Sequence, residues 1–174
     1  AHMINEEGWL EGGLKADLQV IPLQGYSHAT RYDLPIPPSP NLPNAKAVRL
    51  YPSLGLFEGT HVNAGRGTSH QFQCFGAPFL REDHFDFSYT PEPRPGATHP
   101  KQEGLTCHGR DLMRVPPRDS VDLTWLVEAY THRDPAVPFF KTAGFTKHAG
   151  TEQLQQQIEA GWDAKRIREG WQES

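Results

Sequence analysis

Glycine and proline interrupt this chain throughout, with 16 residues of each type among 174. Both residues break regular secondary structure, so a chain with this many of them cannot form a helical bundle or a coiled coil. The sequence nevertheless contains 9 Phe, 5 Tyr and 4 Trp residues, which is too aromatic for a disordered protein. We therefore expect a globular domain with long, shaped loops.

Length and charge narrow the class of protein further. A chain of 174 residues is long enough for one domain with a hydrophobic core. The formal net charge of −4 argues against a surface built to bind the phosphates of nucleic acid. The sequence has no apolar run of about 18 residues, so it predicts no membrane span.

The first residues suggest that the protein extends further upstream. Residues 1–3 are typical of a cleaved expression tag, and native sequence is expected to begin near Ile4. Residues 6–10 are typical of the end of a helix, which Gly12 and Gly13 would terminate. We therefore expect a preceding segment.

The first two thirds of the chain favour strands and loops. Five prolines hold residues 34–44 in an extended form, because proline excludes helix for itself and for the residue before it. Aromatic alternation over 85–91 fits a short core strand, or rings on which a sugar could stack. Long loops are expected over 55–69 and 81–104. Runs rich in apolar and β-branched residues predict strands at 15–23, 45–51, 72–79 and 109–115.

The last third has helical periodicity. Ser120 is a suitable N-cap, and apolar residues after it recur at i, i+3, i+4 and i+7. Thr151 and Asp163 are expected to cap two further helices. Strands first and helices later predict an α+β fold, with a small mixed β-sheet, long Gly/Pro-rich loops and C-terminal helices.

The two cysteines, Cys74 and Cys107, leave two alternatives. A disulfide between them is compatible with the sequence. Buried free thiols are the favoured alternative, because free cysteine behaves as a small buried hydrophobe.

The segment from Leu50 to Thr68 combines Glu, Thr, His, Asn and Arg side chains with four glycines. Glycine permits positive φ and a close approach of backbone to a ligand. Such a loop can present N–H groups, a carboxylate and a guanidinium to one small polar molecule. The alternative is a structural loop in which Arg66 pairs with Glu58. The segment lacks the pattern of a phosphate-binding loop.

Two other features bear on ligands. Prolines around Ser39 and Asn41 fix the backbone, so these side chains would lose little entropy on binding; the alternative is a stiff linker. The histidines, including His61, His70 and His84, lack the spacing of a zinc motif. We expect no metal and no other cofactor.

Five segments of the chain are distinctive: PPSPNLP (37–43), LYPSLGLFEGTHVNAGRGT (50–68), FQCFGAP (72–78), FSYTPEPRPGA (87–97) and AGTEQLQQQIEAGWDAKRIREGW (149–171). Together they resemble one family, the exo-β-N-acetylmuramidases, long catalogued as a domain of unknown function. The resemblance extends from about Trp9 to Trp171, and the matching loops look most like those of Bacteroides-type members.

The resemblance implies an enzyme of two halves. Family members carry an N-terminal Rossmann-like domain followed by the region seen here, with the substrate cleft between them. They remove N-acetylmuramic acid from the non-reducing ends of peptidoglycan fragments. We therefore expect residues 1–3 to be a tag remnant, 4–35 the end of the Rossmann-like half with the linking strand, and 36–174 the C-terminal domain. The implied partners are peptidoglycan fragments or muramyl sugars and the missing half of the same chain, in the periplasm or secreted.

The resemblance also implies site residues. Glycoside hydrolysis generally uses two carboxyl groups. The main acid is expected from the missing half, and Glu58 is the catalytic candidate here, with loop ordering or substrate contact favoured over direct catalysis. Arg66 is expected to hold the lactyl carboxylate of the muramyl sugar through two parallel hydrogen bonds. The other substrate-binding candidates are Thr60, His61, Thr68, Asn41 and Ser39.

Three positions in the loop depart from the family pattern. Relatives often have Asn at His61, Ser at Asn63, and an acidic residue or Val at Ala64, so the sugar that is recognised stays open. We expect this fragment alone to be inactive. A non-catalytic carbohydrate (muropeptide)-binding module and a structural or dimerisation domain are the alternatives.

Overall fold

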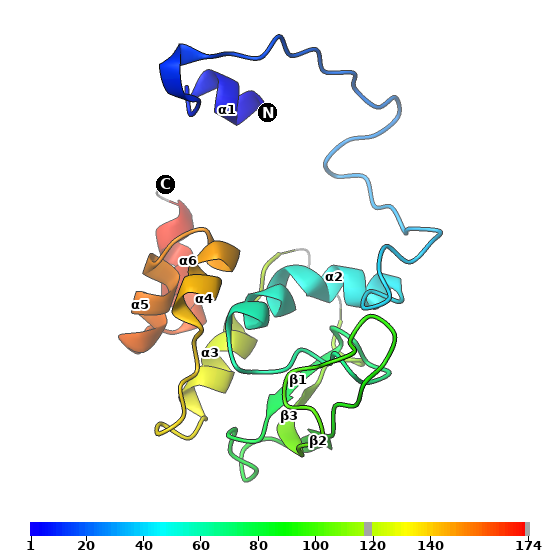
Figure 1. Cartoon of the computed structure of the whole chain (residues 1–174), viewed down its shortest axis with the longest axis vertical. Coiled ribbons are helices and arrows are strands. Elements are labelled where there is room, and N and C mark those ends of the chain that lie inside the picture. The colour runs from blue at the N-terminus through cyan, green and yellow to red at the C-terminus, as the bar shows by residue number, and fades with distance from the viewer. Residues whose placement is uncertain (117–119, 173–174) are drawn as a thin grey trace. The chain divides into compact units, whose positions relative to one another are not determined.

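The computed structural model describes residues 1–116 and 120–172, and the chain divides into two compact units, Ala1–Asp33 and Leu34–Ser174 (Figure 1). The first unit holds helix α1 (His2–Glu6) and the 3-10 turn η1 (Glu11–Gly13). In this unit the Asn5 side chain bonds the backbone of Ala16 in both directions, at 2.8 and 3.0 Å.

The strand predicted over residues 15–23 is wrong. This segment has no regular secondary structure and no strand partner among the described residues. Its large apolar side chains other than the half-buried Leu18 are exposed, with Ile21 at 85%. A strand forms only where a neighbour accepts and donates its backbone hydrogen bonds.

Helix α2 (Ala45–Leu54) replaces the strand predicted over 45–51, which is therefore also wrong. Asn44 caps the helix, because its side-chain oxygen accepts the N–H of Ala47 at 2.9 Å. Apolar residues recur at i, i+3 and i+7, which places them on one helical face. These buried residues are Ala47, Leu50 and Leu54.

The sheet in the described residues has three strands, β1 (Cys74–Ala77), β2 (Phe87–Tyr89) and β3 (Cys107–Asp111). They pair in the order β1-β3-β2, and both pairings are antiparallel, so the sheet is not the mixed one that was predicted. Gly76 lies opposite Gly109 in the pairing of β1 with β3. A Cβ on Gly109 would lie 1.7 Å from the Phe75 carbonyl oxygen, so this close approach of strands requires glycine.

The last third is helical, and the α+β class is confirmed. The elements are α3 (Thr124–Thr131), α4 (Thr142–Ala149), α5 (Gln153–Glu159), α6 (Ala164–Glu169) and the 3-10 turn η3 (Gly170–Gln172). Asp163 caps α6 as predicted, accepting the N–H of Arg166 at 2.8 Å. The Thr151 hydroxyl accepts the N–H of Gln153 at 3.2 Å, at the start of α5.

One predicted cap is wrong, and one helix was not predicted. Ser120 does not cap α3; the side chain of Asp122 accepts the Thr124 N–H at 2.9 Å instead. Ser120 accepts a hydrogen bond from Arg168. Helix α4 contains Gly144 and little helical periodicity, so the sequence pattern did not indicate it.

The core joins α2, β1 and the C-terminal helices. A 3-10 turn, η2 (Gly55–Gly59), leads from α2 and packs directly on α4. A Cβ on Gly59 would lie only 2.4 Å from the Cα of Phe145, a residue with no exposed surface. The glycine therefore allows η2 to touch the α4 backbone, and this contact directs the loop that begins at Glu58.

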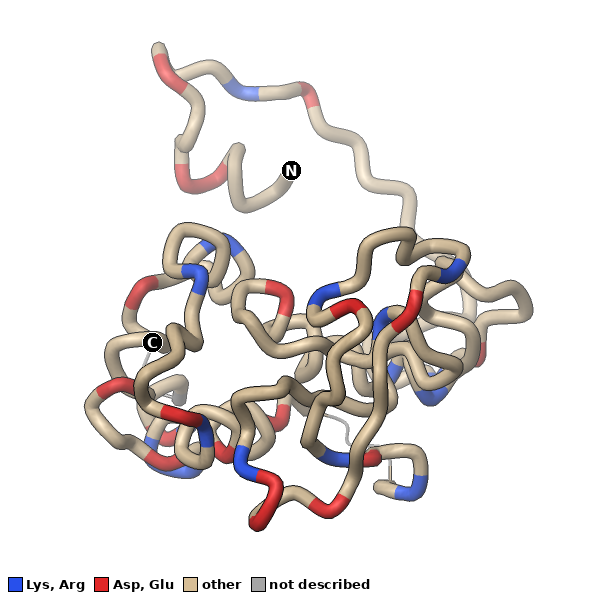
Figure 2. Tube along the Cα trace, turned by 60° about the horizontal axis from the view of Figure 1, so that its bottom comes forward, with Lys and Arg blue, Asp and Glu red and all other residues tan. Residues whose placement is uncertain are grey.

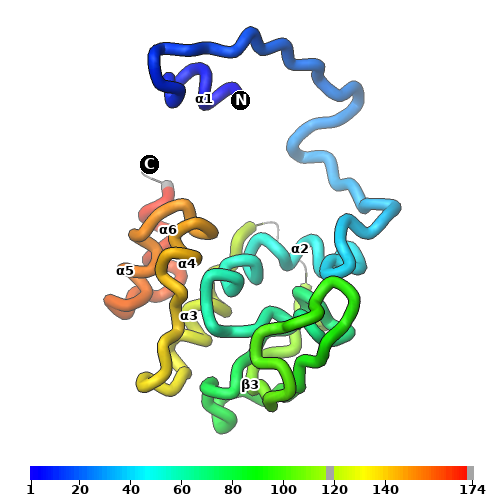
Figure 3. The backbone as a smooth tube through the Cα atoms, in the orientation of Figure 1, coloured from blue at the N-terminus to red at the C-terminus, as the bar shows by residue number. Residues whose placement is uncertain are grey.

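Charged residues of both signs are interspersed along the described part of the second unit, residues 34–116 and 120–172 (Figure 2). None of the helices in the described ranges has the length and apolar character that crossing a bilayer requires. The backbone of the loop that follows η2 lies beside the segment 96–101 (Figure 3). Residues of both segments line one hollow.

Candidate functional site

The loop from Glu58 to Thr68 is fixed on both of its sides. On one side, the backbones of Asn63 and Gly76 exchange two hydrogen bonds of 2.9 Å, which extends the edge of β1. On the other side, the His61 N–H donates to the Phe139 carbonyl at 2.9 Å, and the N–H of the residue before α4 donates to Gly59 at 2.9 Å. The loop is therefore part of the folded framework rather than a free surface excursion.

Thr60 and Thr68, both buried, shape the turns of this loop. Each hydroxyl donates to the carbonyl three residues earlier, at 2.8 Å. Each also accepts the N–H two residues later, at 3.1 Å for Thr60 and 2.9 Å for Thr68. Both hydroxyl groups are thus engaged inside the loop, and a role for them in contacting substrate stays a prediction.

Glu58 and Arg66 form an ion pair that faces a hollow. Nε of Arg66 lies 3.3 Å from Oε1 of Glu58, and the side chains are 35% and 22% exposed, respectively. The internal pairing considered as a structural alternative is therefore present. Both residues nevertheless line a hollow of about 320 Å³, which we call the motif hollow. Nε of Arg66 is buried and makes no hydrogen bond of good geometry within the described residues.

Two glycines hold Arg66 in this position. Gly65 and Gly67 have φ of 77° and 82°, in the left-handed region that favours glycine. A Cβ on Gly65 would lie 2.4 Å from the His70 carbonyl oxygen, and one on Gly67 2.7 Å from Pro100. The Arg66 guanidinium lies 5.4 Å from the centre of the Phe72 ring, and this cation–π contact stabilises the position of the guanidinium.

The opposite wall of the hollow comes from residues 96–101. Arg94 and Ala97 exchange two backbone hydrogen bonds, at 3.0 and 2.9 Å, which close the turn that begins this wall. The N–H of Glu92 donates to the Gly67 carbonyl at 2.9 Å and ties the wall to the loop. The hollow is therefore bounded by two segments that are directly bonded to each other.

Asn41 and Ser39 stand behind this wall rather than in it. The buried Asn41 amide donates to the Gly96 carbonyl at 2.7 Å, and Ser39 Oγ accepts the Asn41 N–H at 3.2 Å. Neither residue lines the hollow. Asn41 thus supports the turn at Gly96, and direct contact of either residue with substrate stays a prediction.

Lys101 lines the hollow, and sequence reasoning did not single it out. Its ammonium donates to the carbonyls of Phe57, Glu58 and Thr60 at 2.8, 3.0 and 2.9 Å. Burial lowers the pKa of Lys101 to about 8, while the nearby carboxylate of Glu58 opposes that shift. No short motif announces this residue, because its partners lie about forty positions away.

Asn63 connects both walls, a role that its place in the motif did not reveal. Its amide donates to the carbonyls of Arg66, at 3.0 Å, and Lys101, at 2.7 Å. The Tyr89 hydroxyl from β2 donates to the carbonyl and side-chain oxygens of Asn63, at 3.1 Å each. A Cβ on Gly76 would lie 3.0 Å from the Tyr89 ring, so the absent side chain gives the ring room.

His61 sits at the edge of the loop with an altered basicity. Burial lowers the pKa of its imidazole, and the cations of Lys141 and Lys101 lower it further. His61 is therefore neutral at pH 7. It keeps its backbone bonds on both sides, with its carbonyl accepting from the Gln102 side chain at 2.8 Å.

The remaining candidate groups lie elsewhere. Cys74 and Cys107 are buried free thiols, so the favoured alternative is confirmed, and burial raises the pKa of each to about 12. Among the described residues, no three His, Cys, Asp or Glu side chains are placed to hold a metal ion. His84 stacks on His132 with ring centres 3.4 Å apart and is not part of the motif hollow.

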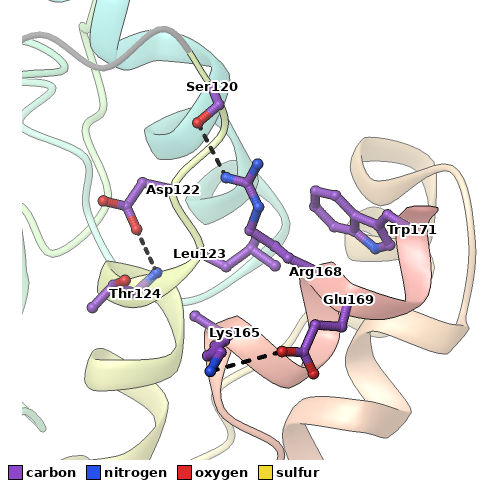
Figure 4. Close-up of a pocket in the computed structure, with 9 residues that line it drawn as sticks. Ser120, Asp122, Leu123, Thr124, Lys165, Arg168, Glu169 and Trp171 are labelled. Atoms are coloured by element: carbon purple, nitrogen blue, oxygen red, sulfur yellow. Dashed lines mark hydrogen bonds and ion pairs between the residues drawn. The ribbon is translucent and has the colours of Figure 1, made fainter.

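A second, larger hollow of about 610 Å³ lies between the start of α3 and helix α6 (Figure 4). Arg168 crosses toward Ser120 and donates to its hydroxyl at 3.1 Å and to the Val121 carbonyl at 2.7 Å. Lys165 pairs with Glu169 at 3.9 Å on the same helix. Arg168, Lys165 and Glu169 in this larger hollow therefore bond to nearby protein groups. No residue of the segment 50–68 lines this hollow. We take the smaller hollow as the candidate site.

Comparisons with known proteins agree on one family. The family described as exo-beta-N-acetylmuramidase NamZ, C-terminal, matches residues 49–174. The peptidoglycan beta-N-acetylmuramidase NamZ of Bacillus subtilis (strain 168) is 31% identical over 175 residues, covering 90% of this chain and 42% of that protein.

A solved structure is similar over almost the whole chain. The crystal structure of a DUF1343 family protein from Bacteroides fragilis matches with a TM-score of 0.87 and 40% identity. The match covers 98% of this chain and 48% of that one. This chain therefore spans less than half the length of either relative.

Proposed function

The chain belongs to the family of NamZ C-terminal domains, and on that premise we propose that it forms one wall of the substrate cleft of a peptidoglycan-degrading glycoside hydrolase. The reaction we propose is release of N-acetylmuramic acid from the non-reducing ends of peptidoglycan fragments. A second, N-terminal half of the protein would form the other wall. A cell-wall substrate places the protein in the periplasm or outside the cell.

The observation that carries this proposal is the Glu58–Arg66 pair at the hollow. N-acetylmuramic acid differs from N-acetylglucosamine by a lactyl carboxylate, and a guanidinium can hold a carboxylate with two parallel hydrogen bonds. Arg66 is held by glycines on both sides, and its Nε lacks a good hydrogen bond in the described residues. Because Nε is buried beside Glu58 and the Arg66 side chain is 35% exposed, the terminal amino groups of the guanidinium are the donors that a ligand carboxylate would reach.

The number of carboxylic acids at the hollow supports an active site that is shared between the two halves of the protein. Glycoside hydrolysis generally needs two carboxyl groups. Among the residues that line the motif hollow, Glu58 is the one carboxylic acid. A catalytic partner for Glu58 would come from the other half, and the chain alone would bind sugar without cleaving it. This same observation keeps a non-catalytic muropeptide-binding module as the second candidate.

The test compares two sugars and two arginines in the full-length protein. Arg66→Ala is expected to lower kcat/KM for a chromogenic β-N-acetylmuramide by about 10- to 150-fold, which corresponds to a charge-assisted hydrogen bond of about 1.5–3 kcal/mol. Activity on the corresponding N-acetylglucosaminide should change little. Arg168→Ala, in the second hollow, is the matched control and should leave the ratio of the two activities unchanged.

Two results would contradict the proposal. Equal losses for both sugars in Arg66→Ala would remove the carboxylate-binding role. Hydrolysis of the muramide by this 174-residue chain alone would show that it supplies both acids, and the shared cleft would be wrong. Binding without hydrolysis by the full-length protein would favour the binding module.

A further inference from the structure

We propose that Lys101 is the positioning residue of this site. The identity of the ligand rests on the proposed function, whereas the contacts of Lys101 do not. Its ammonium group holds the turn from Phe57 to Val62 in the conformation that directs Glu58 and Arg66 into the hollow. Lys101 acts on the substrate only through these two residues.

The first step is the match of donors to acceptors. An ammonium has three N–H donors, and three carbonyls, those of Phe57, Glu58 and Thr60, lie at 2.8–3.0 Å. A fourth, of Val62, lies at 3.5 Å. All donors are thus used on the backbone of one turn, which leaves none for a sugar. The Phe57 carbonyl also accepts the N–H and the hydroxyl of Thr60, at 2.9 and 2.8 Å, so Lys101 adds to a turn that is already closed there. It also ties the carbonyls of Glu58 and Thr60 to the same cation.

The second step is the continuity of this link along the chain. The Lys101 carbonyl accepts the Asn63 amide at 2.7 Å, and the next side chain, Gln102, donates to the His61 carbonyl at 2.8 Å. Gln102 has φ of 62°, a conformation that L residues other than glycine seldom adopt. Two consecutive residues therefore fasten the loop both before and after His61.

The third step concerns the charges around the ammonium. Glu58 attracts it, whereas Arg66 and Lys141 repel it. His61 is also near enough to be affected, because burial, together with the cations of Lys141 and Lys101, lowers the pKa of its imidazole. With a pKa of about 8, Lys101 is mostly charged at pH 7 and keeps its three donors. An apolar side chain in its place would remove the Lys101 donor from the carbonyls of Glu58 and Thr60, which favours opening of the turn.

Hydrogen exchange of this chain, without sugar, tests the proposal. Lys101→Met is expected to speed amide exchange in residues 57–66 at least about tenfold, the effect of losing about 1.4 kcal/mol of local stability. Lys141→Met removes the same charge from an exposed position nearby and should leave exchange of this segment unchanged. Amides of β1 report global unfolding and should exchange alike in both variants.

Equal exchange in 57–66 for Lys101→Met and the wild type would overturn the proposal. If Lys101→Met does not fold, competitive acetylation of the wild type decides instead. Lys101 should titrate near pH 8 and, per unprotonated amine, react more slowly than the exposed Lys165; an equal rate per unprotonated amine would overturn the proposal. Lys101→Met could exchange faster while Arg66→Ala loses activity equally on the muramide and the glucosaminide. This combination would refute the proposed function and leave the positioning role intact.

Discussion

Two hollows of the second unit, the α3–α6 hollow and the motif hollow, differ in what holds their charged side chains. In the α3–α6 hollow, Lys165 and Glu169 pair along one helix at 3.9 Å and are 87% and 65% exposed. In the motif hollow, Glu58 and Arg66 are largely covered. They project from a loop whose backbone is bonded to β1, to the start of α4 and to Lys101.

This difference shows that the larger of the two hollows is not the one with the more firmly held charged groups. The α3–α6 hollow is about twice as large, at 610 against 320 Å³. Preorganised groups lose less entropy when they bind a ligand. The smaller hollow has such groups, because the framework rather than a flexible side chain sets their positions.

The largest expected effect comes from breaking the framework under the motif hollow. Gly59→Ala would place a Cβ 2.4 Å from the backbone of Phe145, so η2 must separate from α4. We expect a loss of about 3 kcal/mol or more in the free energy of unfolding, measured in urea.

Gly144→Ala is the control on the other side of the same contact. A Cβ there meets nothing closer than 3.8 Å, and alanine favours helix over glycine. This variant should be as stable as the wild type or up to about 1 kcal/mol more stable. Similar losses in both variants would show that the close approach of η2 and α4 does not hold the loop.

An intermediate effect is expected from pH, because Lys101 is buried. Its pKa of about 8 in the folded protein lies below the ordinary 10.5 of the unfolded chain. Between these values the unfolded chain retains a proton that the folded protein has released, so raising the pH favours folding. The full cost of the buried charge applies below about pH 8 and disappears above about pH 10.5.

The stability of the wild type relative to Lys101→Met should therefore rise between pH 8 and 10.5. Urea unfolding of both proteins across this range measures the difference. Parallel pH profiles would show that Lys101 keeps an ordinary pKa and is more exposed to water than the structure indicates.

The smallest effect is expected in the α3–α6 hollow. Lys165→Gln removes an exposed ion pair between residues four apart on a helix. Such pairs contribute less than about 0.5 kcal/mol, so the urea midpoint should hardly move. A loss comparable to that of Gly59→Ala would remove the contrast between the two hollows.

The sequence pattern predicted the elements whose signals are local. Asp163 caps α6, and the apolar run around Cys74 forms β1. The pattern over 45–51 was misread, because its Val, Leu and Tyr residues suit a strand. The helical spacing of the buried residues and the Asn44 cap are the signals that decide for α2. Helix α4 depends on a tertiary contact with Gly59, which no local pattern reports.

The candidate site was predictable to a similar extent. The motif brought Glu58 and Arg66 together, and their pairing was among the alternatives considered. The roles of Lys101 and Asn63 depend on contacts across about forty residues. Asn41 was singled out for its rigid surroundings, and the structure places it behind the wall of the hollow at Gly96.

The Tyr89 hydroxyl reaches Asn63 only because position 76 has no side chain. Positions 63, 76 and 89 are therefore linked by contact, although position 76 belongs to the sheet and position 63 to the loop that lines the motif hollow. A serine at position 63 would lack the amide that spans the carbonyls of Arg66 and Lys101. Such a chain would need another donor to bridge the two walls.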